Sequence, residues 1–144
     1  REINLPSNIK VSDLGTGGID VIHALEGWTI GIILDAVDIP NLKPGEIITF
    51  EITSESIPSV SGFSSTHGFD IFTALQLAFQ LQDYLLPNRI IVIGIQIEDI
   101  NGLGTELSQA VINAKPIVLE KIFELLEEPQ FFSNTAKRKF ATDT

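Results

Sequence analysis

Two short runs of apolar, largely β-branched residues constrain the fold of this chain more than any other feature. The first covers residues 29–34 (TIGIIL) and the second covers residues 89–96 (RIIVIGIQ). Such runs, with little alternation of polar residues, are typical of strands that are buried on both faces of a largely parallel sheet. A sheet of this kind is covered by helices, so the chain is expected to fold as an α/β domain.

The remaining periodic segments alternate in the order that a layered α/β domain requires. The expected fold is a three-layer α/β/α sandwich of the phosphorylase/hydrolase-like kind, with a mostly parallel, twisted central sheet. Residues 1–130 are expected to form a single α/β domain, and residues 131–144 a polar C-terminal tail. Further strands are expected at residues 9–12 and 46–53, and helices at residues 18–26, 68–83 and 105–126, the last kinked or split by Pro116.

Composition excludes several classes of function. The chain has 144 residues and a formal net charge of −10, which argues against binding to nucleic acid or to anionic membranes. It has no cysteine, so disulfides, thiolate metal ligands and a cysteine nucleophile are excluded. No apolar run is long enough to cross a bilayer, and no signal-peptide pattern is present. A cytoplasmic location is expected.

A carboxylate and a histidine stand where open α/β sheets keep their sites. Asp35 directly follows the first apolar run, as a cap for the next loop or as a ligand that faces the crevice. His67 opens the second helix, with Thr66 as its N-cap, and the helix dipole favours the neutral imidazole that a divalent metal needs. The alternative for His67 is a hydrogen bond to a loop carbonyl. Asp38 is interpreted as a turn residue and His23 as a surface or packing residue.

Two other sequence patterns are weaker indications of a functional site. Residues 15–18 (GTGG) allow close approach to an anion, but they lack a full nucleotide-binding motif and a nearby basic residue. The serines at 64 and 65 next to His67 lack the elbow of a nucleophilic serine. A nucleotide site and a serine triad are therefore disfavoured.

Four segments in series resemble the family of NiFe-hydrogenase maturation endopeptidases. They are residues 13–27 (DLGTGGIDVIHALEG), 31–37 (GIILDAV), 65–75 (STHGFDIFTAL) and 91–111 (IVIGIQIEDINGLGTELSQAV). Together with their spacing, they extend the resemblance over about residues 8–127.

The resemblance implies a function and a set of site residues. Enzymes of this family remove a C-terminal peptide from the precursor of the hydrogenase large subunit after nickel has been inserted. Two carboxylates and one histidine of the endopeptidase recognise nickel that the substrate presents. By resemblance, Asp35 matches the second carboxylate and His67 the histidine, while Asp13, Gly15 and Thr16 match a loop at the cleft. The resemblance assigns no catalytic residue.

The chain also departs from the family pattern. The family's first strand, the acidic loop that supplies the first carboxylate, and the following helix have no counterpart in it. We therefore expect a fragment of a whole enzyme rather than a reduced relative, with a bare sheet edge that an N-terminal segment or another copy covers by self-association. Glu98, followed by Asp99, is a weaker candidate for a substitute carboxylate. The alternative function is a non-catalytic binding module or maturation chaperone that docks a metallated partner.

Overall fold

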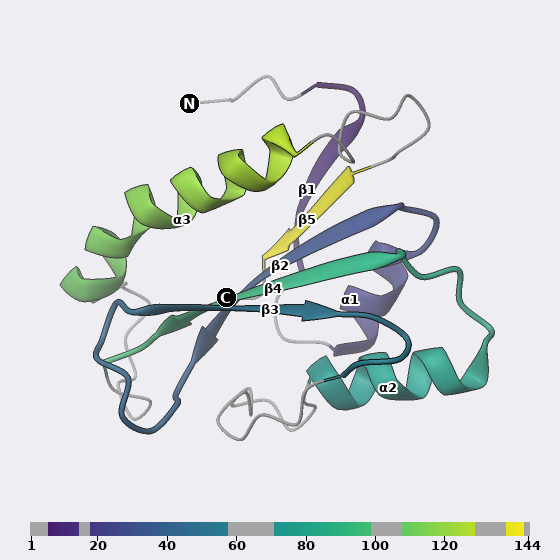
Figure 1. The fold of residues 1–144 in the computed structure, drawn as a ribbon, viewed down its shortest axis with the longest axis horizontal. Helices are drawn as coiled ribbons and strands as arrows, with labels where there is room; N and C mark the ends of the chain where they lie inside the picture. The colour runs from purple at the N-terminus through teal and green to yellow at the C-terminus, as the bar shows by residue number, and fades with distance from the viewer. Residues whose placement is uncertain (1–5, 15–17, 58–70, 99–107, 129–137, 143–144) are drawn as a thin grey trace.

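The computed structural model describes five stretches of the chain: residues 6–14, 18–57, 71–98, 108–128 and, as backbone, 138–142 (Figure 1). These stretches form five strands and three helices. In chain order they are β1 (Ile9–Asp13), α1 (Gly18–Leu25), β2 (Ile30–Val37), β3 (Ile47–Ile52), α2 (Ile71–Leu81), β4 (Arg89–Gln96), α3 (Gln109–Glu127) and β5 (Arg138–Thr142).

The strands form one twisted sheet with the order β1-β5-β2-β4-β3 (Figure 1). The first four strands in this order run parallel to one another, and β3 pairs antiparallel with β4. The predicted α/β class with a mostly parallel central sheet is confirmed. The two apolar runs become the neighbouring strands β2 and β4, each of which has partners on both sides, as their composition predicts.

Residues 138–142 differ from the prediction. Residues 138–142 were expected to lie in a polar tail, yet they form β5 between β1 and β2. The sheet was also expected to lack a strand and to expose an edge, and β5 fills that position in the described structure. The basic and polar letters of this segment (RKFAT) suggest a solvated tail, but ladder pairing on both sides depends on the main chain and not on those side chains.

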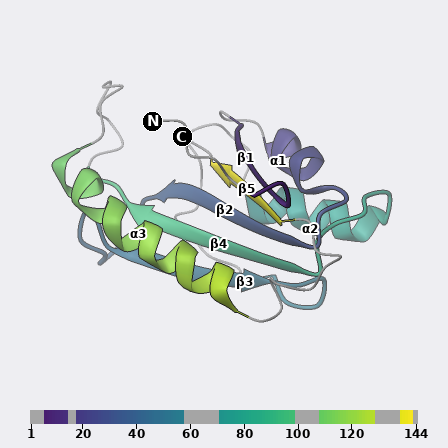
Figure 2. The same cartoon turned by 90° about the horizontal axis from the view of Figure 1, so that it is seen from above.

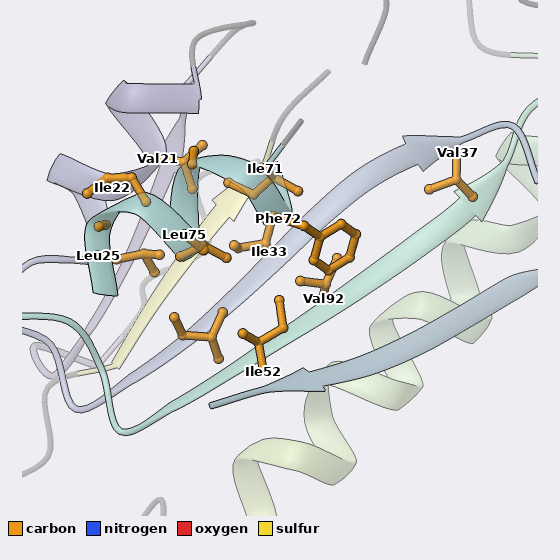
Figure 3. Close-up of a cluster of buried hydrophobic side chains, with 13 residues drawn as sticks. Val21, Ile22, Leu25, Ile33, Val37, Ile52, Ile71, Phe72, Leu75 and Val92 are labelled. Carbon is orange, nitrogen blue, oxygen red and sulfur yellow. The ribbon is translucent and has the colours of Figure 1, made fainter. Parts of the chain in front are cut away.

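Alternate residues of the sheet pack against helices on its two faces. Ile33 and Val92 belong to a buried cluster that α1 and α2 complete, as Figure 3 shows. Ile32 and Ile91, each one residue earlier in its strand, pack against α3 on the opposite face, where Figure 2 shows that helix alone among the drawn helices. Because successive side chains of a strand point to opposite faces, the sheet contributes residues to two hydrophobic cores, one on each face.

Helix α3 is continuous across Pro116, so the predicted split of this segment is wrong, while the alternative, a kink at Pro116, stays a prediction. Ser108 caps its first turn, because its Oγ accepts a hydrogen bond from the Val111 N–H at 3.4 Å. Ala114 and Val118, two residues before and two residues after the proline, are buried, and Val118 packs with the β2 and β4 side chains on the α3 face. An interior proline costs about 3 kcal/mol, and burial of the apolar face of α3 against the sheet offsets this cost.

Arg89 joins three elements at the edge of the sheet where β4 begins. Its Nε donates to Glu51 Oε1 of β3 at 2.7 Å, and its Nη1 donates to Glu128 Oε2 after α3 at 2.6 Å. The hydrogen bond to Glu51 is the main cause of a raised pKa for the Arg89 guanidinium. Within the stretches given above, no helix has the length and apolar character needed to span a bilayer.

Candidate functional site

Asp35 lies inside β2 rather than after it. The predicted strand ended at Leu34, but β2 continues to Val37 because its ladder with β4 continues to the pair Val37–Gln96. Asp35 is 9% exposed as a residue and points to the same face of the sheet as Ile33 and Val37, which is the face that α1 and α2 cover. Asp35 is thus a buried carboxylate near the carboxyl end of an interior parallel strand.

The direction of α2 relates this carboxylate to the segment that contains His67. Helix α2 leads into the start of β4, so it runs opposite to β4 and its first turn at Ile71 lies toward the carboxyl ends of the parallel strands (Figure 1). Asp35 lies toward the same edge and on the same face of the sheet. His67 is outside the described residues, and its approach to Asp35 stays a prediction.

Asp13 lies near Asp35 along the sheet but on the other face. It pairs in register with Thr142, which in turn pairs with Leu34, so one strand separates Asp13 from β2. Two strand spacings amount to about 10 Å. Leu34 packs on the side of α3, and residues in register point to the same face, which places exposed Asp13 on that side. Gly15 and Thr16, the other predicted cleft residues, are outside the described residues.

Gln96 is a polar residue of this edge that the sequence analysis missed. It ends β4, is 4% exposed, and its Oε1 accepts a hydrogen bond from the Ile39 N–H at 2.8 Å. Its Nε2 donates to Asp38 Oδ1 at 3.1 Å and to the Ile97 carbonyl at 3.3 Å. The signal in the sequence was a glutamine at the end of an otherwise apolar run. Gln96 fixes the chain just after β2, and Asp38 is more than a turn residue because it accepts one of these bonds.

The other candidate ligands are exposed. Glu98 lies two residues beyond β4 and faces solvent, and Asp99 is outside the described residues. The His23 side chain is 58% exposed and its ring lies edge-on to Tyr84, which agrees with the predicted surface or packing role. Among the described residues, no group of three potential metal-ligating side chains occurs.

A surface pocket of about 450 Å³ lies at the opposite end of the sheet from Asp35, where β4 begins and β3 ends. Its walls come from the turn after β3 and the last turns of α2, because Ile52 at the end of β3 pairs with Ile90 at the start of β4. This pocket is far from Asp35 along the strands and is not the predicted site. It is lined by Ser54, Glu55, Ile57, Gln76, Phe79, Gln80 and Gln82.

Comparison with known proteins adds a family to this geometry. A family model described as hydrogenase maturation protease matches residues 1–125. The chain is 27% identical over 137 residues to hydrogenase expression/formation protein HupD of Thiocapsa roseopersicina, covering 94% of this chain and 58% of that protein. It is 31% identical over 109 residues to HupD of Rhodobacter capsulatus, covering 74% of this chain and 50% of that protein. The chain thus spans about half the length of these relatives.

Solved structures show the same fold. The hydrogenase maturating endopeptidase HybD from E. coli superimposes with a TM-score of 0.68 at 20% identity, over 87% of this chain and 75% of that one. The solution structure of an endopeptidase from Escherichia coli gives the same score and coverage at 22% identity. At these identities the likeness supports the arrangement of the strands and helices.

Proposed function

Because this chain belongs to the hydrogenase maturation protease family, we propose that the whole protein is an endopeptidase that removes the C-terminal extension from the precursor of a hydrogenase large subunit. The buried carboxylate of Asp35 carries this proposal. Burying a carboxylate in an apolar interior strand costs free energy unless the carboxylate has a partner. Buried ionisable side chains are concentrated at functional sites. A cytoplasmic location stays a prediction.

Nickel enters this proposal as part of the substrate. A carboxylate oxygen of Asp35 and an imidazole nitrogen of His67 are ordinary donors for several divalent metals, nickel among them. If these two side chains contact nickel that is already held in the precursor, a precursor without nickel is positioned poorly and is cleaved slowly. The chain's own residues then bind and orient the metallated precursor, and they hold no permanent metal.

Replacing the two proposed ligands tests the function. In the complete protein, Asp35→Asn and His67→Ala are expected to slow processing of nickel-loaded precursor by about 100-fold or more, since losing a supporting group alone typically costs 10–100-fold. The mass of the precursor before and after incubation measures cleavage. Asp38→Asn is the matched control, because its amide oxygen still accepts from Gln96 and it should process normally.

Three outcomes separate the alternatives. Normal processing by Asp35→Asn would contradict the proposed role of this carboxylate. Tight binding of nickel-loaded precursor by the complete protein with no change in precursor mass would instead favour the binding module or maturation chaperone. A loss of processing in Glu98→Gln would identify Glu98 as the substitute carboxylate, whereas its exposed position predicts no effect.

A further inference from the structure

Strand β1 is held in the sheet through β5. Each residue of β5 has a partner in β1 (Ile9–Asp13) on one side and a partner in residues 30–34 of β2 on the other. No ladder among the described strands joins β1 directly to β2. Removing β5 therefore leaves two open strand edges, and any parallel strand that enters the same position closes both of them.

The sequence of β5 is unusual for an interior parallel strand. It reads RKFAT and begins with two cations, whereas β2 reads IGIILDAV. Interior parallel strands are normally apolar on both faces. Main-chain hydrogen bonds therefore contribute a larger fraction of the stabilisation of β5 in the sheet than of β2. Those bonds form equally well with residues 138–142 of another copy.

Charge favours the approach of this segment to another copy. Residues 137–139 (KRK) are a basic run in a chain with a net charge of −10. A cationic segment is attracted over a distance to an acidic molecule, and salt weakens this attraction. The encounter between this segment and a second copy is therefore favoured at low ionic strength.

The chain between α3 and β5 is long enough for β5 to pair within its own copy or with a second copy. Arg138 at the start of β5 pairs with Ile30, and Ile30 pairs with Arg89. Arg89 also binds Glu128, which follows α3. The end of α3 and the start of β5 therefore lie at the same end of the sheet, where the parallel strands begin. A chain as long as that between Glu128 and Arg138 can span at most about 35 Å, which exceeds the roughly 10 Å between two strands that have one strand between them. A tethered strand has an effective concentration on the order of mM, so exchange between copies should rise with protein concentration.

We propose that β5 is an exchangeable strand, and that the position between β1 and β2 takes residues 138–142 of a second copy to give a strand-swapped dimer. This inference rests on the sheet and is independent of the proposed function. Thr142 of β5 aligns with Asp13 and with Leu34, the neighbour of Asp35. In the swapped dimer, the strand between β1 and β2 of each copy therefore comes from the other copy.

The absence of cysteine makes a direct test possible. Lys10 and Lys139 pair in register on β1 and β5, at a strand spacing that a disulfide can bridge. One copy carrying Lys10→Cys is mixed with another carrying Lys139→Cys, and the two are unfolded, refolded together at high concentration and oxidised. Non-reducing electrophoresis and light scattering are expected to show a disulfide-linked heterodimer. The control replaces Lys139→Cys with Lys115→Cys, an exposed position on α3.

The double variant Lys10→Cys/Lys139→Cys tests closure within one copy. At low concentration it should form an intrachain disulfide and stay monomeric, and at high concentration linked dimers should appear. An intrachain disulfide at every concentration, with no heterodimer above the Lys115→Cys control, would show that β5 is not exchanged. Failure of the double variant to form any disulfide would overturn the pairing of β1 with β5 and the proposal with it.

Discussion

At the scale of single residues, the carboxyl edge of the sheet depends on one glutamine. Gln96 uses both ends of its amide: the oxygen accepts from Ile39 N–H and the nitrogen donates to Asp38 and to the Ile97 carbonyl. Buried amides require such partners, because an unsatisfied polar group in the interior costs free energy. Gln96 thereby holds the chain that leaves β2 two residues after Asp35.

Gln96→Ala is expected to lower the free energy of unfolding by about 1–3 kcal/mol, because it leaves the Ile39 N–H and the Asp38 carboxylate without this partner. Urea unfolding followed by circular dichroism measures the change. Gln80→Ala, on the exposed side of α2, is the matched control and should change stability by about 0.5 kcal/mol or less. Equal effects of the two substitutions would mean that the hydrogen bonds of Gln96 contribute little.

At the scale of elements, the turn between β2 and β3 is joined to α3 by close backbone contact. Gly45 has φ of +86°, and its N–H donates to the Gln96 carbonyl at 2.9 Å. A Cβ at this position would lie 2.8 Å from the Ala110 carbonyl oxygen in the first turn of α3. The turn between β2 and β3 therefore also fixes the position of the first turn of α3.

Gly45→Ala should destabilise the protein more than Gly27→Ala. Both glycines have positive φ, which costs an L-residue about 1–2 kcal/mol, but a Cβ at Gly27 meets nothing within 4 Å. The difference between the two variants in urea unfolding isolates the clash with Ala110. Equal losses would show that the turn and α3 move apart at little cost.

At the scale of the whole molecule, the first and last described strands depend on each other. Strand β1 reaches the other described strands only through β5, while β2 and β4 pair directly along eight residues. Pairing between distant parts of a chain carries a large entropic cost of closure. The outer part of the sheet should therefore open before the part formed by β2, β4 and β3.

Phe140→Pro is expected to release β1 while leaving β4 protected. Phe140 pairs with Val11 and with Ile32, and proline removes a ladder donor from the middle of an interior strand. Amide hydrogen exchange should increase strongly in residues 10–12 and little in residues 90–95. The control is Thr144→Pro, two residues along the chain from Thr142, the last residue of the described ladder. An equal increase in β1 for both variants would argue against this dependence.

Local sequence pattern determined much of this protein by itself. The apolar runs became β2 and β4, the spacing of Ile71, Phe72 and Leu75 became the buried face of α2, and the segment before residue 27 became α1. Periodicity and turn residues act over a few positions, so they can be recognised in a single sequence. The choice of Asp35 came from the same reasoning, since a carboxylate beside an apolar run stands out.

Tertiary structure alone decided how these parts meet. Pairing with β4 kept Asp35 inside its strand, and register with β5 placed Asp13 on the opposite face from Asp35. The partners of Gln96 come from residues far away in sequence. Segment 138–142 reads as polar, and it became a strand because the position between β1 and β2 offers ladder partners on both sides. Strand register and partner choice depend on contacts between distant residues, which no local pattern encodes.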